Sequence, residues 1–268
     1  MKSACQKCRR LLGLRWLFAL LLISLFHHRV QAQVMGDAVD VSQDFQKMEQ
    51  VYFIGERVAN FDPATGRGTL EWVRNLRRLS LSFNKLDRGF ERAKSSDFPG
   101  TEYEENPKLP FEVSFISPRT VRLRFATRSQ PLGGALSLML VSALPRDNTW
   151  KVESSDTAVT YTSAHGKLRL VKSPWRIEFL GPSGRVLTRT QNLQEVASFS
   201  QPLPFSFVRR GADLGHSVAA SFRLAPDEKI FGCGESFTRL NKRGQKVHAY
   251  TRDGMGAQTD KMYKPIPF

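Results

Sequence analysis

Clustered acidic residues are the first side chains in this sequence that suggest chemistry. Glu102, Glu104 and Glu105 surround Tyr103 in a charged stretch. Two carboxylates about 5 Å apart cleave a glycosidic bond with retention of configuration. Neighbouring residues of one loop rarely hold such a geometry without a rigid scaffold, so the pattern favours a solvated acidic loop. No catalytic residue is assigned from it.

Asp253 stands in a different setting, the stretch YTRDGMG that begins at Tyr250. A carboxylate accepts hydrogen bonds from sugar hydroxyl groups, and an aromatic ring covers the apolar face of a sugar. Arg252 precedes the aspartate, and Gly254 and Gly256 allow the loop to bend. These residues suggest a sugar contact, although Asp before Gly is also common in plain turns.

The other reactive side chains indicate no catalytic or metal site. FGCGESF, residues 231–237, lacks the third glycine of a dinucleotide fingerprint and the G-x-S-x-G spacing of a nucleophile elbow. His165, His216 and His248 are far apart in the chain and show no metal-ligand spacing. Cys233 lies between two glycines, where a buried and inert thiol is expected. The sequence therefore predicts neither a metal nor another cofactor.

The N-terminal segment has the features of a secretory signal peptide. Residues 1–32 contain a basic start, the apolar run WLFALLLISLF and the small Ala32 at the cleavage position. The run is too short to span a bilayer comfortably, and an uncleaved anchor is the alternative. The signal predicts a periplasmic or extracellular protein with no membrane contact after cleavage. A linker or flexible start is expected over residues 33–50, and one domain over residues 51–268.

The charge of the mature chain does not indicate a nucleic-acid-binding protein. The full chain has a formal net charge of +15. Residues 1–32 hold six of the 40 basic residues and none of the 25 acidic ones, so the mature chain carries 34 − 25 = +9. The remaining charges are interspersed, and Arg122 and Arg124 alternate with apolar residues. This pattern is typical of a solvated sheet face.

Apolar and polar residues alternate with period two along most of the mature chain, which predicts β-strands. In TVRLRFAT, Val121, Leu123 and Phe125 share one face. Hairpin-length connections occur at AHG around Gly166 and at GPSG, residues 181–184. Many short strands of this kind predict an all-β fold, an antiparallel β-sandwich.

Two further stretches affect the expected architecture. The charged residues 87–110 are expected to form a long loop, either disordered or laid over one sheet face. The mature 268 − 32 = 236 residues suffice for one large sandwich. They do not also hold a (β/α)8 barrel, which takes about 250 residues of its own.

The closing segment contains several motifs at fixed spacing. An aromatic-Gly-x-Gly-Glu turn followed by an aromatic residue is matched by Phe231, Gly232, Gly234, Glu235 and Phe237. An Asn-Lys-x-Gly run is matched by Asn241, Lys242, Gly244 and Gln245, and an aromatic-x-x-Asp element by Tyr250 and Asp253. A Tyr-Lys-x-Ile-Pro-Phe ending is matched by Tyr263, Lys264, Ile266, Pro267 and Phe268. With these motifs the chain resembles the N-terminal domain of glycoside hydrolase family 31, the α-glucosidase and α-xylosidase family, closely over residues 218–268 and more weakly back to about residue 110.

The resemblance implies a galactose-mutarotase-like β-sandwich that precedes a (β/α)8 barrel carrying both catalytic aspartates. Those aspartates would lie beyond Phe268, so this chain is expected to be the opening third of an enzyme or the product of a broken gene, and inactive alone. The resemblance implies substrate-binding roles for Asp253, Arg252 and Tyr250, on a loop over the barrel mouth. Arg252 is similar to the α-xylosidase branch. A structural role in the turn and loop is implied for Gly232, Gly234, Glu235, Asn241, Lys242 and Gly244.

The implied function is that of a support domain in a retaining α-glycosidase of carbohydrate metabolism. Its implied partners are an α-glucoside or α-xyloside and the barrel, not nucleic acid. A rival hypothesis is a free-standing, non-catalytic carbohydrate-binding module that binds sugar through Trp150, Trp175 or Tyr250. A mutarotase-like isomerase would need a histidine and a carboxylate converging on one sheet face, and the scattered histidines argue against it.

Overall fold

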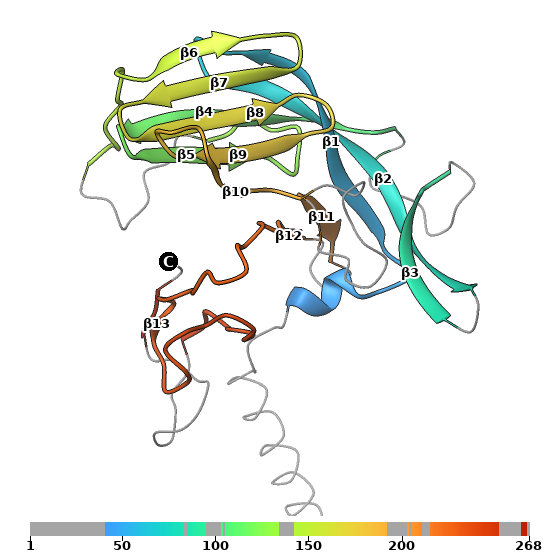
Figure 1. Ribbon diagram of the computed structural model, residues 1–268. Helices are drawn as coiled ribbons and strands as arrows, with labels where there is room; N and C mark the ends of the chain where they lie inside the picture. The colour runs from blue at the N-terminus through green and yellow to red at the C-terminus, as the bar shows by residue number, and fades with distance from the viewer. Residues whose placement is uncertain are drawn as a thin grey trace, which may run out of the picture. The chain divides into compact units, whose positions relative to one another are not determined.

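The computed structural model describes residues 41–82, 85–94, 103, 105–133, 142–191, 203, 205–210, 215–251 and 264–266 (Figure 1). The chain divides into two units, Val41–Glu228 and a second unit made of Met1–Asp40 and Lys229–Phe268. The expected signal peptide, residues 1–32, lies outside the described residues. Across these described ranges, no helix is long and apolar enough to cross a membrane.

The larger sheet of unit Val41–Glu228 is antiparallel and has seven strands. Their order is β12-β11-β1-β2-β4-β5, and β3 also pairs with β2. The strands are β1 (Val51–Asp62), β2 (Arg67–Ser82), β3 (Lys85–Arg92), β4 (Lys108–Ser117), β5 (Thr120–Phe125), β11 (Ser206–Arg209) and β12 (His216–Ala219). The long β2 organises this sheet, because one of its edges pairs with β1 while the other pairs first with β4 and then with β3.

The smaller sheet is an antiparallel meander of five strands in the order β10-β9-β8-β7-β6. Its strands are β6 (Lys151–Ser154), β7 (Ala158–Ser163), β8 (Gly166–Val171), β9 (Arg176–Leu180) and β10 (Val186–Arg189). The two hairpin connections predicted from AHG and GPSG join β7 to β8 and β9 to β10. The period-two pattern holds here, since Val159 and Tyr161 on β7 and Leu168 and Leu170 on β8 are buried.

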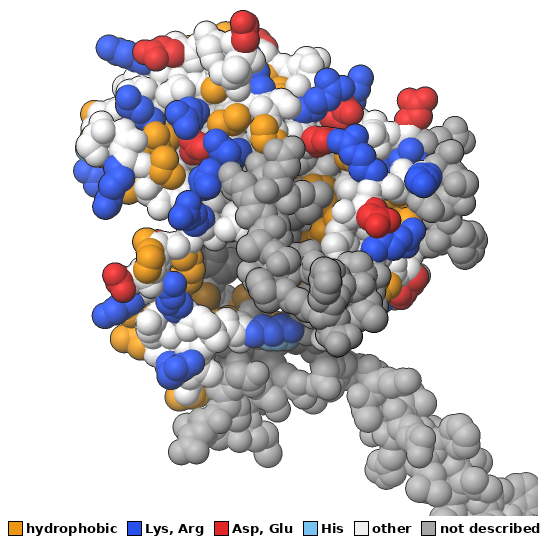
Figure 2. All heavy atoms as spheres, turned by 45° about the vertical axis from the view of Figure 1, so that its right-hand side comes forward, with side chains coloured by type: hydrophobic (Ala, Val, Ile, Leu, Met, Phe, Trp, Pro, Cys, Tyr) orange, Lys and Arg blue, Asp and Glu red, His pale blue; other side chains and the backbone are white. Residues whose placement is uncertain are grey.

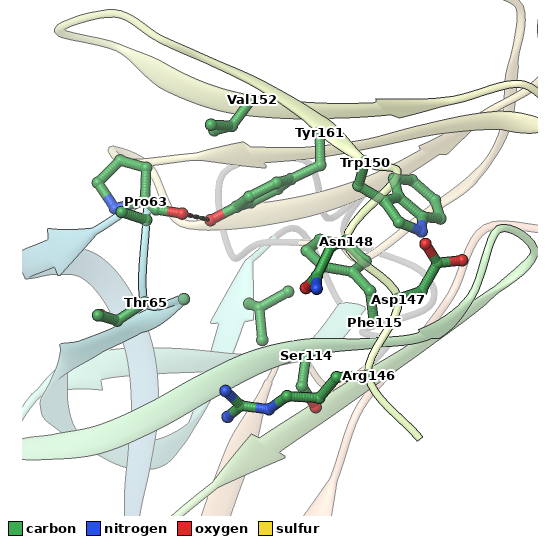
Figure 3. Close-up of a pocket in the computed structure, with 13 residues that line it drawn as sticks. Pro63, Thr65, Ser114, Phe115, Arg146, Asp147, Asn148, Trp150, Val152 and Tyr161 are labelled. Atoms are coloured by element: carbon green, nitrogen blue, oxygen red, sulfur yellow. Dashed lines mark hydrogen bonds between the residues drawn. The ribbon is translucent and has the colours of Figure 1, made fainter. Parts of the chain in front are cut away.

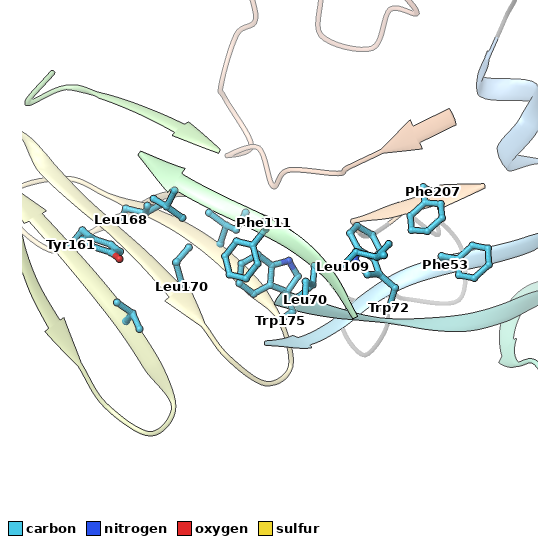
Figure 4. Close-up of a cluster of buried hydrophobic side chains, with 13 residues drawn as sticks. Phe53, Leu70, Trp72, Leu109, Phe111, Tyr161, Leu168, Leu170, Trp175 and Phe207 are labelled. Carbon is cyan, nitrogen blue, oxygen red and sulfur yellow. The ribbon is translucent and has the colours of Figure 1, made fainter. Parts of the chain in front are cut away.

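Apolar side chains from both sheets meet in one core (Figure 4). Phe111 on β4 lies near its centre and is 1% exposed. Its ring centroid lies 5.1 Å from that of Phe61, 5.6 Å from Phe125 and 5.4 Å from Trp175. Two antiparallel sheets that share a core are a β-sandwich. The predicted fold class is therefore confirmed.

A second, smaller cluster covers the other face of β1. A 3-10 helix, η1 (Val41–Phe45), places the buried Phe45 against Tyr52, with ring centroids 6.4 Å apart. Phe90 of β3 meets the same tyrosine ring edge-on at 5.2 Å. Residues 41–45 lie in the stretch expected to be a linker or flexible start, yet Phe45 joins the core. The reason is that β1 carries apolar side chains on both faces, and those on its second face are buried by packing against Phe45 and its neighbours.

Residues 85–92 correct the expectation of a long loop over residues 87–110. They form β3, which pairs with β2 from Asn75↔Arg92 to Ser82↔Lys85, and β4 already begins at Lys108. β2 extends past the end of β4 and would otherwise leave a row of unpaired backbone groups. Pairing with β3 satisfies these groups, and that requirement outweighs the charged composition of the stretch.

The smaller sheet contains a buried ion cluster. The Glu178 side chain on β9 is 2% exposed and accepts hydrogen bonds from two arginines. Arg169 Nε lies 2.7 Å from Glu178 Oε2, and Arg176 Nε lies 2.6 Å from Glu178 Oε1. A buried carboxylate is stable only when it is paired and hydrogen-bonded. These two arginines supply that compensation.

Two buried tyrosines predict a loss of stability at alkaline pH. Burial raises the pKa of Tyr161, helped by the charge of Asp62, and the Tyr161 hydroxyl donates a hydrogen bond to Pro63 O at 2.8 Å. Burial also raises the pKa of Tyr52, against the opposing effect of Arg77. A raised folded-state pKa stabilises the fold below the unfolded value of about 10. That stabilisation is lost as the pH rises through the folded pKa. Each tyrosine then lowers the free energy of unfolding by up to about 1.4 kcal/mol per pH unit.

The matched variant for this effect is Tyr161→Phe, measured by urea unfolding between pH 7 and 11.5. Below pH 9.5 the variant should be slightly less stable than the parent, because it lacks the hydrogen bond to Pro63. Above pH 10 the parent should lose stability faster than the variant. A constant difference between the two proteins across the whole pH range would contradict the prediction.

Candidate functional site

Residues 229–251 and 264–266, here called the motif segment, carry the described part of the family-like motifs. Two short strands, β13 (Gly234–Glu235) and β14 (Lys264–Pro265), pair antiparallel within it. Ile266 N donates a further hydrogen bond to Cys233 O at 3.3 Å. The aromatic-Gly-x-Gly-Glu turn and the closing Lys-x-Ile element are therefore in contact, although 28 residues separate Glu235 from Lys264.

The turn requires a left-handed backbone at three successive residues. The φ angles of Gly232, Cys233 and Gly234 are 110°, 72° and 88°. A Cβ atom on Gly234 would lie 2.1 Å from Lys264 O, closer than any real contact. Contrary to expectation, Cys233 is half-buried rather than buried. The physical reason is that the turn packs its glycine backbone, not the thiol, against β14.

Asn241 and Lys242 form a hydrogen-bond network inside the motif segment. Asn241 Oδ1 accepts hydrogen bonds from Ile230 N and Arg243 N, both at 3.2 Å. The Lys242 side chain is buried, and its ammonium donates to Ser236 Oγ at 2.7 Å and to Thr238 Oγ1 at 2.8 Å. These contacts tie residues 230–243 to one another and use the Asn241 side-chain oxygen and the Lys242 ammonium inside the segment.

The motif segment presents other side chains to the outside. Glu235 is exposed, and so is Tyr250, which is 49% exposed. The motif segment also exposes the large apolar side chains of Phe231, Phe237, Leu240 and Ile266. Arg252 and Asp253, the other two residues expected to bind substrate, lie outside the described residues. Of the three expected sugar contacts, Tyr250 alone is described, and it is accessible.

Alanine at Gly234 is expected to disrupt the motif segment, whereas alanine at Gly244 should be tolerated far better. Both glycines have a positive φ, 88° and 72°, so both substitutions carry a backbone cost of about 1–2 kcal/mol. A Cβ atom at Gly244 meets nothing within 4 Å, whereas one at Gly234 collides with Lys264 O. Hydrogen-exchange mass spectrometry of peptides covering residues 229–251 measures the difference. Equal protection in the two variants would show that the close approach of β13 and β14 does not hold the segment.

The sandwich unit contains a pocket of about 210 Å³ (Figure 3). Three aromatic side chains line it, Phe115, Trp150 and Tyr161. Trp150 is held in place because its ring stacks on Phe115 at 4.6 Å and its Nε1 donates to Ser117 O at 3.0 Å. Polar lining groups come from Thr65, Ser114, Arg146, Asp147 and Asn148.

The composition of this pocket fits the binding of a small molecule. Aromatic walls with a few polar groups are typical of small-molecule sites, and sugars have both the apolar faces and the hydroxyl groups to match. Asp147 is the one carboxylate among the described lining residues, and its Oδ1 already accepts hydrogen bonds from Thr149 N and Oγ1 at 2.7 and 2.6 Å. A pair of facing carboxylates, which glycoside cleavage requires, is not formed by the described lining residues.

The other residues singled out from the sequence are scattered. Trp175, expected to be an exposed aromatic, is 2% exposed because it fills the space between the two sheets. Glu105 is exposed, while Tyr103 meets Phe53 edge-on at 5.5 Å; Glu102 and Glu104 lie outside the described residues. His216 Nδ1 lies 2.8 Å from Thr127 Oγ1. The described residues contain no group of three or more His, Cys, Asp or Glu side chains that could hold a metal ion.

The sequence pointed to Trp150 as a possible sugar contact, but it did not predict the pocket around this residue. Its lining residues come from four separate stretches, around residues 63–66, 113–115, 146–152 and 161. The one local signal is the polar-aromatic run DNTW, residues 147–150, which contributes three of the lining residues. The contacts between the stretches depend on the sandwich and carry no local signature.

Comparison with known proteins gives a consistent result. The family model of the glycosyl hydrolase 31 N-terminal galactose mutarotase-like domain matches residues 110–268, more than half of the chain. The alpha-xylosidase XylQ of Lactiplantibacillus pentosus is 26% identical over 118 residues, which are 44% of this chain and 14% of XylQ.

Two solved structures from Listeria monocytogenes share the fold. The protein lmo2446, titled as uncharacterized, superposes with a TM-score of 0.52 at 19% identity. The cycloalternan-forming enzyme in complex with a pentasaccharide substrate superposes with a TM-score of 0.50 at 17% identity. In both cases 81% of this chain and 16% of the solved chain are covered, so this chain spans a small part of the relatives that it matches.

The family match extends over the same range as the resemblance seen in the sequence, from about residue 110 to residue 268. It includes most of β4 and all of β5, β11 and β12 of the larger sheet, all of the smaller sheet and the motif segment. The sandwich fold and the motif-bearing segment thus point to one assignment. The chain belongs to glycoside hydrolase family 31, in which it corresponds to the N-terminal galactose mutarotase-like domain.

Proposed function

We propose that this chain is the N-terminal domain of an exported, retaining α-glycosidase that hydrolyses an α-glucoside or an α-xyloside. In this proposal the domain supports a (β/α)8 barrel and supplies a substrate-contact loop with Tyr250, Arg252 and Asp253. The observation that carries it is the motif segment, which is ordered internally by Asn241 and Lys242. The same segment leaves large apolar side chains and Tyr250 exposed. Exposed apolar side chains gathered in a short segment mark a surface that another element covers.

The named relatives support the substrate class. XylQ is called an alpha-xylosidase, and the cycloalternan-forming enzyme was solved with a pentasaccharide substrate. Both act on or bind carbohydrate, which agrees with a carbohydrate partner for this chain. The choice between glucoside and xyloside rests on Arg252, because an arginine at this position is similar to the motif of the α-xylosidase branch.

Asp253→Ala is expected to lower kcat/KM at least tenfold in the native gene product that includes the barrel. The aspartate is proposed to bond sugar hydroxyl groups, and a tenfold loss corresponds to about 1.4 kcal/mol of transition-state stabilisation. The assay is hydrolysis of 4-nitrophenyl α-glucoside and α-xyloside, together with a thermal unfolding curve. Asp227→Ala is the control, because Asp227 is exposed and lies outside the motif segment. Unchanged kinetics in the Asp253 variant would remove this residue from the substrate site.

Export is tested by N-terminal sequencing of the protein purified from its native source. Cleavage after Ala32 predicts a mature protein that begins at Gln33. A protein that still begins at Met1 would overturn the proposed signal peptide.

A free-standing carbohydrate-binding module is the second candidate, and the pocket beside Trp150 favours it. In that case the isolated chain should bind a neutral oligosaccharide. Arg146→Ala and Asn148→Ala should weaken binding, since both residues line the pocket. Arg185→Ala should have no effect, because Arg185 is exposed on the β9–β10 connection and does not line the pocket. Equal affinity in all three variants would exclude this pocket as the site.

A further inference from the structure

A second and larger pocket, about 580 Å³, lies at one end of the sandwich unit. It is bounded by the turn between β4 and β5 and by the turn between β7 and β8. The two turns belong to different sheets and are joined by a hydrogen bond from Ser163 Oγ to Pro118 O at 2.7 Å. Both walls are therefore anchored, which is a condition for a preformed site.

One part of the lining of this end pocket is apolar. Val121 comes from the larger sheet, and Leu168, Phe179 and Leu187 come from the smaller one. Leu187 is 51% exposed, so its side chain is accessible to a ligand. Trp150 lines this pocket as well as the first one. Such walls suit the apolar face of a sugar ring.

The rim of the end pocket is cationic. Its two cations are Arg119, in the turn between β4 and β5, and Lys167 on β8. The His165 ring lies in the turn between β7 and β8. None of the described lining residues is acidic. Within the described residues, neither Arg119 nor Lys167 forms an ion pair. The electrostatic complement of this rim is a negative charge at the pocket mouth.

We propose that the end pocket binds a saccharide that carries a carboxylate, with the sugar ring on the apolar walls and the carboxylate on Arg119 and Lys167. Both features are needed for this assignment. A neutral sugar would leave the two cations without a partner, and a plain inorganic anion would make no use of Val121, Phe179 and Leu187. Charge-assisted hydrogen bonds from arginine and lysine are the strong contacts to a carboxylate. This site goes beyond the proposed function and needs no barrel, so either proposal can fail alone.

The test is isothermal titration calorimetry of the full chain with an acidic disaccharide, glucuronic acid linked to glucose. The matched neutral ligand has glucose in place of the glucuronic acid, and inorganic phosphate is the third ligand. The test variant is a double variant that carries both Arg119→Gln and Lys167→Gln. The control variant is Arg122→Gln, because Arg122 is exposed nearby on β5 and does not line the pocket.

The expected result is saturable binding of the acidic disaccharide by the parent and by the Arg122 variant. The double variant should bind at least tenfold more weakly, and sodium chloride at 0.5 M should weaken binding by the parent. Binding of the neutral disaccharide as tight as that of the acidic one would overturn the proposal. So would unchanged affinity in the double variant, and so would phosphate binding as tight as that of the sugar acid.

Discussion

Replacement of Phe111 by alanine is expected to lower the free energy of unfolding of the sandwich unit by about 3–5 kcal/mol. Phe111 is 1% exposed, and its ring meets Phe61 and Phe125 in stacked geometry. It also contacts Trp175, which comes from the connection between β8 and β9. The substitution therefore opens a cavity where the two sheets meet, and removes ring contacts on both sides.

Urea unfolding followed by circular dichroism measures this loss. Val186→Ala on β10 is the control, because Val186 is 43% exposed and its truncation should change stability by less than about 0.5 kcal/mol. Phe111→Leu should cost less than Phe111→Ala, since leucine fills more of the cavity. If the alanine variant were as stable as the Val186 control, Phe111 would not hold the two sheets together.

Removal of both arginines around Glu178 is expected to cost about 3–5 kcal/mol of stability. In Arg169→Met with Arg176→Met, the carboxylate on β9 stays buried and loses both charged partners. A buried charge without a partner lowers the free energy of unfolding far more than an intact buried ion pair raises it. The side chains of Arg169 and Arg176 are 41% and 19% exposed, so the methionines themselves add little strain.

A third substitution, Glu178→Leu, separates this effect from a general loss of packing. Added to the two methionines, it removes the isolated carboxylate, and the triple variant should recover most of the lost stability. Thermal and urea unfolding of the parent, the double variant and the triple variant provide the comparison. A triple variant no more stable than the double would show that the cost comes from lost side-chain contacts and not from the unpaired charge.

The fold class could be predicted from the local sequence pattern. Period-two alternation in TVRLRFAT places Val121, Leu123 and Phe125 against the core and Arg122 outside, as the sandwich has them. The hairpins at Gly166 and at residues 181–184 followed from turn composition. These features are short-range, because a strand and a short turn are encoded by residues next to one another.

The family assignment also followed from the sequence, since the motif residues lie at fixed spacing. The internal contacts of Asn241 and Lys242 are short-range as well, within about a dozen residues. The half-buried position of Cys233 did not follow, because it depends on β14, which lies about 30 residues further along the chain. Figure 2 agrees with the interspersed charge expected from composition, with Lys and Arg side chains spread over the visible face and Asp and Glu among them.

Only the tertiary structure decided the remaining features, because each depends on pairing or packing against another strand. Trp175 is buried because it packs between the two sheets. Strand β3 forms because it pairs with β2, although a loop was expected there. Phe45 is buried because it packs on the second face of β1. The two pockets likewise collect side chains from both sheets. The sequence alone determined the all-β fold class, the strands with period-two alternation and the family to which the chain belongs, because those signals are local. The tertiary structure decided which faces are covered and where cavities remain, because burial and pairing are settled only when distant strands pack together.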